Sequence, residues 1–341
     1  MGTKTLSLQQ ATILKPGKIP EKILKRSVIA PLRVKRDEVI LGSGVGEDCG
    51  AVLCEPDEVL VMSTDPITGT AIDIGHLAVD ITANDIASAG AEPIGILLTV
   101  LLPEESNEAE LKTIMSDVNA SCEKLNLSVI GGHTEVTDVV NRPVLSVTGV
   151  GKVKRDAMIT TSGAKPGMDL VVTKYEGLEG TAIIASEKKE ELLQKFPEDF
   201  IDNAIHFNTM LSVVKDGLIA AGAGAAAMHD VTEGGIFGAL WEMGEASGVG
   251  LSVDIEKIPL RQETVEICDY FKIDPYCLIS SGSMLIAAPN GSKVVTALEQ
   301  EGIHAAVIGS CDDTNQRVVH YDGQTRYLKP PAADEFHKVL G

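Results

Sequence analysis

Aromatic side chains are scarce in this sequence of 341 residues, because phenylalanine, tryptophan and tyrosine together make up 4% of it. The six cysteines form no Cys-x-x-Cys pair and no zinc-like spacing, so we expect reduced thiols rather than a zinc site. No apolar run approaches the roughly 20 residues of a membrane-spanning helix, and the Lys-dotted N-terminus lacks the apolar segment of a signal peptide. These absences predict a cytoplasmic protein without a membrane partner.

Positive charge is also in short supply. The chain has 29 basic against 49 acidic residues, a formal net charge of −20. A field of this sign repels nucleic acids and anionic membranes, so neither is an expected partner. It would repel a free nucleotide as well, so a bound ATP would need divalent cations, held by the protein's own carboxylates, to reverse the local sign.

Length and composition predict two folded domains of the α/β class. The chain is 44% hydrophobic, enough for full cores, and domains average about 150 residues. The pattern loosens into charged and turn residues around 152–165, so we place the domains at 1–160 and 161–341. The main predicted elements of the first half are strands over 58–63, 94–102, 127–130 and 144–150 and helices over 73–89 and 107–125. Those of the second half are strands over 170–173, 225–228, 250–253, 284–288 and 305–308 and helices over 235–246 and 292–301.

Five segments place glycine or acidic residues near strand ends or in helices. They are Gly42-Ser-Gly44-Val-Gly46-Glu-Asp48-Cys-Gly50, Ser63-Thr-Asp65-Pro66, Asn84-Asp85, Gly131-Gly132-His133-Thr-Glu135 and Met228-His-Asp230-Val-Thr232-Glu-Gly234-Gly235. Glycine lets backbone N–H groups approach phosphates, helix N-termini bind anions, and strand ends carry ligands in α/β proteins. Ordinary structure also explains each segment alone, as a glycine-rich turn, a cap, a solvated helix face or a loop surface. Their order and shared placement favour a phosphate site.

Gathering Asp48, Asp65 and Asp85 in one place would require a cation. Two unit charges about 4 Å apart repel by roughly 4 kcal/mol at an effective dielectric constant near 20. Hard oxygen ligands suit Mg²⁺, which binds through a few carboxylates plus substrate phosphates. A site that combined these three side chains would therefore suit Mg²⁺ and a nucleotide.

These residues resemble the AIR synthase-related group, which includes aminoimidazole-ribotide (AIR) synthase, selenophosphate synthetase, thiamine-monophosphate kinase and the hydrogenase expression/formation protein HypE. The segment from Gly44 to Val52 is similar to the group's Gly-x-Gly-Asp/Glu-Asp-Ala-Ala-Val loop. Asn84-Asp85-Ile-Ala-Ser-Ala-Gly-Ala-Glu-Pro93 is similar to its Asn-Asp-Ile-x-x-x-Gly-Ala-x-Pro signature, the most specific of the matches. The likeness covers about 17–327, and residues 229–235 and 240–250 are most similar to HypE.

The resemblance implies a two-domain AIR synthase-like fold, in which the N-terminal domain forms a dimeric β-barrel with a second copy and the C-terminal domain is an α/β sandwich. It implies an ATP- and Mg²⁺-dependent homodimeric enzyme that phosphorylates an oxygen of an acceptor. Metal ligands carry over to Asp48, Asp65 and Asp85, with Glu135 as a further candidate, and a catalytic role to Asp230. We assign nucleotide or phosphate contacts to Lys18, Gly44, Gly46, Asn84, Gly131, Gly132, Thr232 and Gly234.

Two departures from the group's patterns leave the acceptor open. His133 stands where thiamine-monophosphate kinase has an aspartate, and Mg²⁺ prefers oxygen to nitrogen ligands, so we expect His133 to contact phosphate or acceptor or to act as a general acid or base. HypE carries its reacting group on a C-terminal cysteine tail, whereas this sequence has no cysteine after Cys311, so we do not expect that reaction. We expect a HypE-like enzyme. The alternatives are a thiamine-monophosphate-kinase-type kinase, or a non-catalytic ATP-binding accessory protein that serves metalloenzyme maturation with a partner protein.

Overall fold

The computed structural model of the chain describes residues 13–331, except 47–48 and 69–72, together with residues 333–340. It divides into two compact units. The N-terminal unit comprises the described residues up to Cys54, Thr64–Thr82 and Ile94–Val150, and the C-terminal unit comprises Glu55–Ser63, Ala83–Pro93 and the described residues from Gly151 onward. Both units mix helices with strands, which confirms the predicted α/β class. The domain limits at residue 160 stay a prediction.

The N-terminal sheet has the strand order β1-β6-β5-β7-β4. Its strands are β1 (Gly17–Lys18), β4 (Glu58–Ile67), β5 (Glu92–Leu102), β6 (Ser128–Val136) and β7 (Val144–Lys154). β5 and β6 are parallel, as expected for two strands joined by a helix, and β1 pairs antiparallel with β6. A second, smaller pair, β2 (Val39–Leu41) and β3 (Ala51–Val52), packs Val39 and Val52 against Ile130 of β6.

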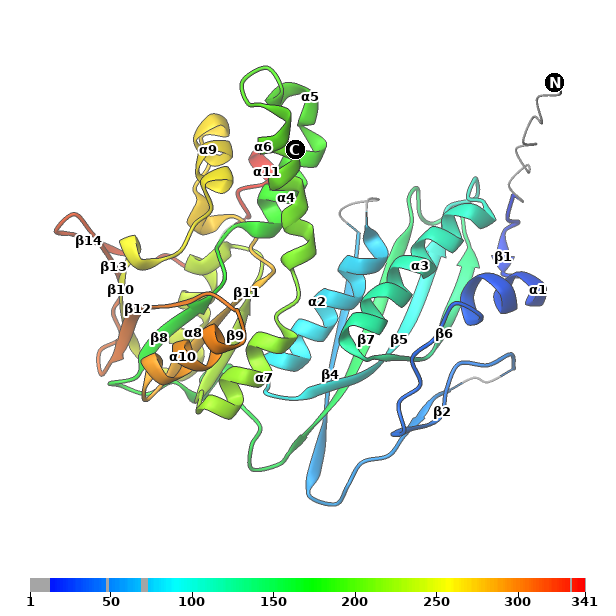
Figure 1. The fold of residues 1–341 in the computed structure, drawn as a ribbon, viewed down its shortest axis with the longest axis horizontal. Helices are drawn as coiled ribbons and strands as arrows, with labels where there is room; N and C mark the ends of the chain where they lie inside the picture. The colour runs from blue at the N-terminus through cyan, green and yellow to red at the C-terminus, as the bar shows by residue number, and fades with distance from the viewer. Residues whose placement is uncertain (1–12, 47–48, 69–72, 332, 341) are drawn as a thin grey trace. The chain divides into compact units, whose positions relative to one another are not determined.

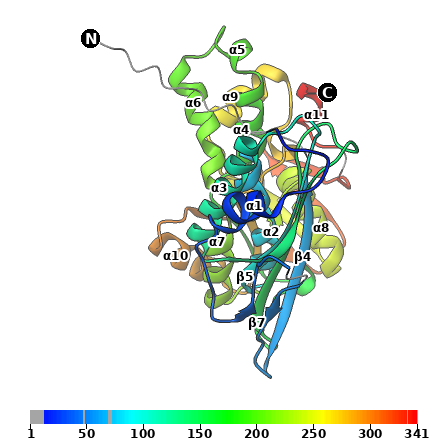
Figure 2. The same cartoon turned by 90° about the vertical axis from the view of Figure 1, so that its right-hand side faces the viewer.

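Helices α2 (Ile74–Ser88) and α3 (Glu108–Leu125) lie along one face of this sheet, as Figures 1 and 2 show from two sides. Both helices confirm the predictions made from the apolar periodicity of the sequence. Their close approach depends on Gly75, because a Cβ there would lie 2.5 Å from the carbonyl oxygen of Ile114. Asn107 caps α3 by accepting hydrogen bonds from two backbone N–H groups, and the Glu110 side chain bonds back to Asn107, which makes a capping box.

The C-terminal sheet has the strand order β14-β13-β10-β12-β8-β11-β9. Its strands are β8 (Asp169–Thr173), β9 (Ala227–Val231), β10 (Gly250–Asp254), β11 (Ser283–Ala288), β12 (Ala305–Asp312), β13 (Arg317–Tyr321) and β14 (Gln324–Tyr327). Neighbouring strands are antiparallel except β10 and β13. Alternate residues of the inner strands face opposite layers, so both faces of the sheet are buried.

The helices of the C-terminal unit cover its sheet in layers. Leu170 and Val172 of β8 pack with α8 (Gly235–Ser247), whereas Val171 packs with α7 (Val214–Ala223) and α10 (Gly291–Gln300) on the other face. A further cluster joins α4 (Leu178–Glu187), α6 (Glu198–Ile205) and α9 (Gln262–Phe271). Short helices α5 (Lys189–Leu192) and α11 (His337–Leu340) complete this part (Figure 1).

Among the strands that run further than the sequence pattern predicts, β4 and β6 carry predicted site residues. β4 continues through Asp65 to Ile67, and β6 continues through Gly131 and Glu135 to Val136. The pattern ends these strands too early because it treats polar and glycine residues as strand ends, whereas backbone pairing between β5 and β6 persists to Val136. The predicted site residues of these segments therefore lie within strands. None of the helices in the described part of the chain has both the length and the apolarity that crossing a membrane requires.

Candidate functional site

A small cavity in the N-terminal unit brings two of the predicted glycine segments together. Its lining includes Ser43, Gly44, Gly131, Gly132 and Thr134, and its volume is about 70 Å³. A larger hollow of about 320 Å³ shares Ser43 with it and adds the basic residues Lys35 and Arg36. In this part of an acidic chain, glycine segments therefore lie near a basic side chain, Lys35, while Arg36 is paired with Glu38. Positive charge next to glycine backbone suits an anionic ligand.

Glycine is required at two of the predicted phosphate-binding positions. Gly132 has φ +151°, and a Cβ there would lie 1.9 Å from the carbonyl oxygen of Leu98 on β5. Gly46 has φ +83°, a left-handed conformation that L side chains rarely adopt, with open space around it. Close strand packing therefore explains Gly132 without a ligand, whereas Gly46 turns the chain at the edge of the glycine loop.

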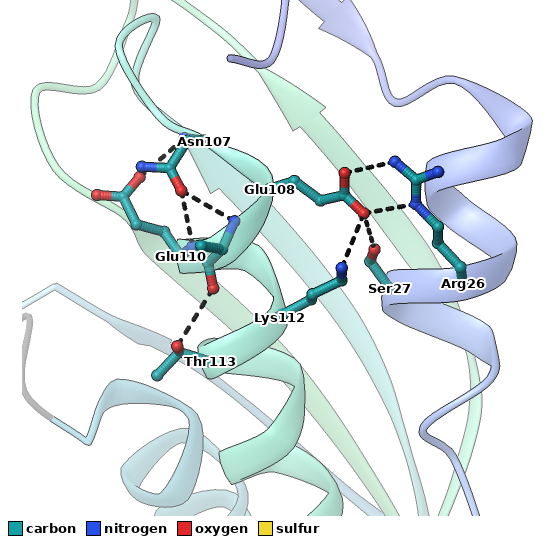
Figure 3. Close-up of polar contacts among 8 residues, drawn as sticks. Arg26, Ser27, Asn107, Glu108, Glu110, Lys112 and Thr113 are labelled. Atoms are coloured by element: carbon teal, nitrogen blue, oxygen red, sulfur yellow. Dashed lines mark hydrogen bonds and ion pairs between the residues drawn. The ribbon is translucent and has the colours of Figure 1, made fainter. Parts of the chain in front are cut away.

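One wall of the small cavity is held in place by a buried carboxylate (Figure 3). Residues 24–29 form a short helical segment that contributes Leu24, Val28 and Ile29 to the lining. Glu108 at the start of α3 accepts hydrogen bonds from Arg26 at 2.6 and 2.5 Å and from Ser27 at 2.8 Å. The hydrogen bond from Arg26 is the main cause that lowers the pKa of Glu108 to about 2. The wall thus stays fixed to α3 at any physiological pH.

His133, Glu135 and Lys18 gather at one edge of the N-terminal sheet. His133 Nε2 lies 3.1 Å from Glu135 Oε2, and Lys18 of β1 stands opposite Glu135 of β6. The His133 and Glu135 side chains are about two-fifths exposed. A histidine, a glutamate and a lysine that lie this close together could contact a polar ligand. The metal role of Glu135 and the catalytic role of His133 remain predictions.

Besides Glu135, the structure describes the predicted metal ligands Asp65 and Asp85. Asp65 lies on β4 two residues after Ser63, and the Ser63 hydroxyl donates a hydrogen bond to Asp85 Oδ2 of α2. Carboxylate oxygens are the ligands that Mg²⁺ prefers, so the donor type fits. Asp48 lies outside the described residues, and those residues contain no group of three or more His, Cys, Asp or Glu side chains arranged to hold a metal.

Asn84, the neighbour of Asp85, has a structural role in the C-terminal unit. Its side chain is buried, its Nδ2 donates to the carbonyl oxygen of Leu211 at 2.8 Å, and its Oδ1 accepts from Val213 N–H at 2.7 Å. These bonds tie α2 to the segment before α7. The Asn-Asp pair therefore combines one residue that fixes the backbone with one that offers a carboxylate.

The remaining predicted residues lie where β9 leads into α8. Asp230 is buried at the end of β9, and the Thr232 carbonyl oxygen accepts hydrogen bonds from Gly235 N–H and Ser280 N–H. Gly234 has φ +82°, and its N–H donates to Asp334 Oδ2 at 2.8 Å. The turn at the start of α8 is therefore built from glycine and backbone bonds, and a carboxylate already occupies the Gly234 donor.

Sequence reasoning missed His229, which precedes Asp230 in the same motif. Its Nε2 lies 2.8 Å from Glu242 Oε2 of α8. Burial lowers the pKa of His229, but the hydrogen bond to Glu242 and the charges of Asp230, Glu242 and Asp85 outweigh it and raise the pKa above its ordinary value. His229 could have been identified from its place in the motif, because a histidine beside an aspartate at a strand end is a plausible site residue.

Comparison with known proteins finds family matches in both halves of the chain. Residues 46–153 match the family model of the AIR synthase related protein, N-terminal domain, and residues 165–322 match that of the C-terminal domain. The chain is 29% identical to carbamoyl dehydratase HypE of Rhizobium leguminosarum bv. viciae over 75% of this chain and 72% of that protein. It is 31% identical to thiamine-monophosphate kinase of Methanospirillum hungatei over 66% of this chain and 74% of that protein.

A solved structure shares the fold over nearly the full length. It is the crystal structure of the hydrogenase maturation protein HypE in complex with ATP, which superimposes with a TM-score of 0.81 over 95% of this chain and 99% of that chain at 21% identity. At 21% sequence identity, this structural similarity shows a shared fold and nothing further.

Proposed function

Because the chain belongs to the AIR synthase-related family, a family of ATP-dependent enzymes, we propose that it binds ATP with Mg²⁺ and phosphorylates an oxygen atom of an acceptor. The observation that carries the proposal is the N-terminal cavity, where the glycine loop meets Gly131 and Gly132 of β6. Backbone N–H groups in such a cavity bind phosphate oxygens directly. Lys35, in the adjoining hollow, adds cationic charge for the same ligand, whereas Arg36 is already paired with Glu38.

Asp65 and Asp85, with Asp48, would hold the Mg²⁺. When bound, the ion neutralises charge on the transferring phosphate. The net charge of −20 makes this cation a requirement for nucleotide binding. The chain's own groups then position the reactants, and catalysis rests on that positioning and on charge neutralisation. We assign Asp230 and Thr232 to the acceptor or the phosphates, while Gly234, whose N–H already donates to Asp334, shapes the turn that follows them.

The acceptor is proposed to resemble that of HypE in its reacting group, a carbonyl or amide oxygen. The similarity to carbamoyl dehydratase HypE supports this assignment. A second candidate is phosphorylation of a small molecule, which the 31% identity to a thiamine-monophosphate kinase supports. The two candidates share the nucleotide site and differ in the acceptor.

We also propose a homodimer through the N-terminal sheet. On β4, Leu60 and Met62 are exposed while their neighbours Val59 and Val61 pack against Ile86 of α2. Leu97 of β5 is exposed as well. A sheet face with large exposed apolar side chains indicates an interaction surface. Joining this face to its counterpart on a second copy would cover these side chains.

Release of ADP tests the proposed activity. The purified chain, given ATP and Mg²⁺, should form ADP, and chelation of Mg²⁺ should stop it. Asp85→Asn should lower the rate at least tenfold, while Asp117→Asn on α3, a half-buried aspartate outside the predicted site, should leave it unchanged. Formation of thiamine diphosphate from thiamine monophosphate would favour the second candidate. Absence of ADP under all these conditions would contradict the proposal.

A further inference from the structure

Two buried glutamates stand three residues apart where β8 leads into α4. Glu176 is fully buried, and Glu179 has 6% of its surface exposed. Buried carboxyl groups are rare unless they are paired or serve a function. Neither residue is among the site residues described above, so each needs its own physical explanation.

Glu176 is explained by the fold. Ser280 Oγ donates a hydrogen bond to its Oε2 at 2.9 Å, and Ser283 Oγ donates to its Oε1 at 2.6 Å. Ser280 Oγ also accepts from Gly177 N–H at 2.7 Å. Both carboxyl oxygens are thus satisfied, and the network ties the start of α4 to β11. Burial raises the pKa of Glu176 to about 7, against the effect of the two serine hydrogen bonds.

Glu179 differs from Glu176 in one respect. Ser281 forms hydrogen bonds with it through its side chain and backbone, yet the buried Oε2 of Glu179 has no hydrogen-bond partner among the described residues. Leaving such an atom without a partner costs about 1–3 kcal/mol, and in native proteins these exceptions often mark a functional group. Glu179 Oε2 is therefore a buried hydrogen-bond acceptor that the described residues leave without a partner, whereas both oxygens of Glu176 have one.

Glu179 contacts the segment that runs beside the candidate acceptor site. Ser280 N–H donates to the Thr232 carbonyl oxygen, and Met284 of β11 stands opposite Asp230 of β9. Ser281, the partner of Glu179, lies between these two connections. Burial raises the pKa of Glu179 to about 7, the hydrogen bonds from Ser281 lower it, and the charges of Asp334 and Glu233 raise it further.

We propose that Glu179 is the acid–base residue that accepts a proton from the acceptor. This role rests on the proposed ATP-dependent activity. The acceptor oxygen forms a bond to the γ-phosphorus of ATP, the bond from that phosphorus to the β,γ-bridging oxygen breaks, and ADP leaves. The proton that the acceptor loses passes to Glu179 Oε2. A carboxyl group that titrates near neutral pH suits this transfer.

The surroundings of Glu179 also select the chemistry of the acceptor. Asp334 and Glu233 are its electrostatic neighbours, and Asp334 occupies the Gly234 N–H donor. Three carboxyl groups around one position disfavour an anionic reacting group. The acceptor should present an O–H or N–H donor, as an alcohol or amide does, and carry no negative charge at the reacting end.

The test compares Glu179→Gln with Glu176→Gln, its matched control three residues away. The rate of ADP release from Mg·ATP is measured with water as the acceptor, across pH 5.5–9, with the melting temperature of each variant. Glu179→Gln should lower kcat by about 100-fold or more, leave KM for ATP unchanged, and remove the rise in rate through about pH 7. Glu176→Gln should retain both the rate and the pH profile.

Ser281→Ala provides a second readout that a purely structural role would not move. The hydrogen bonds from Ser281 lower the pKa of Glu179, so their loss should shift the rise in rate to higher pH. Equal kcat for Glu179→Gln and the wild-type chain, or an unchanged pH profile in both variants, would overturn the role of Glu179 alone. A wild-type chain that releases no ADP would contradict the proposed function and this role with it.

Discussion

Replacing Glu176 with glutamine should make the stability of the C-terminal unit less dependent on pH. The side chain is fully buried, and burial raises its pKa from 4.5 to about 7 in the folded protein. Between these values the folded state keeps a proton that the unfolded state has lost. Stability therefore falls as the pH rises through this interval and is lowest above about pH 7.

The magnitude follows from the size of the pKa change. At about 1.4 kcal/mol for each tenfold change in acidity constant, the rise from 4.5 to about 7 corresponds to roughly 3 kcal/mol of stability lost across the interval. Glutamine does not ionise, so this part of the pH dependence disappears. The glutamine amide nitrogen donates a hydrogen bond to a serine hydroxyl, whereas the carboxylate accepted one. This exchange changes the free energy of unfolding by an amount that does not vary with pH.

Urea unfolding at several pH values between 5 and 8 measures the effect. The chain has one tryptophan, Trp241 on α8, so its fluorescence reports the C-terminal unit. As the pH rises from 5 to 8, the free energy of unfolding of the wild-type chain should fall relative to that of Glu176→Gln by up to about 3 kcal/mol. Glu179 contributes equally to both proteins and cancels. Parallel curves would refute the reasoning.

Three further predictions concern other parts of the molecule. Asn84→Ala should destabilise the protein by about 2–4 kcal/mol in chemical unfolding, because it leaves two buried backbone groups without partners; unchanged stability would show that these bonds carry no weight. His133→Ala should lower turnover more than Mg²⁺ affinity, and His133→Asp should raise Mg²⁺ affinity by placing a second carboxylate beside Glu135; calorimetric Mg²⁺ titration with rate measurements decides between this and a direct metal role. Met62→Glu should convert the proposed dimer to a monomer in light scattering, whereas Val265→Glu, at an exposed position on α9, should not; a wild-type chain that is already monomeric would rule out the dimer.

Local sequence patterns predict the helices of the first half well. The apolar spacing of α2 and the Asn107 cap of α3 are signals within one or two turns of the chain, and both helices lie where the pattern places them. The extent of β4 and β6 was not predictable in this way. Their polar residues continue the strands because pairing with neighbours distant in sequence holds them extended.

Some residues of the candidate site could likewise be predicted from the sequence, and others could not. Gly44, Gly131 and Gly132 come from two segments that the sequence singles out, and the structure brings them to one cavity. Glu179 gave no comparable signal, because a single glutamate in the first turn of a helix is ordinary. Its partner Ser281 lies far along the chain, and only the fold shows that one of its buried oxygens lacks a partner.

Calorimetric titration of ATP into the chain, with and without Mg²⁺, tests the central claim most directly. Binding should be detectable with Mg²⁺ and absent or much weaker without it, because the net charge of −20 repels the nucleotide. Asp85→Asn should weaken binding of Mg·ATP at least tenfold, about 1.4 kcal/mol, while Asp117→Asn matches the wild-type chain. Equal affinity with and without Mg²⁺, or an Asp85→Asn affinity equal to that of the wild-type chain, would contradict the account.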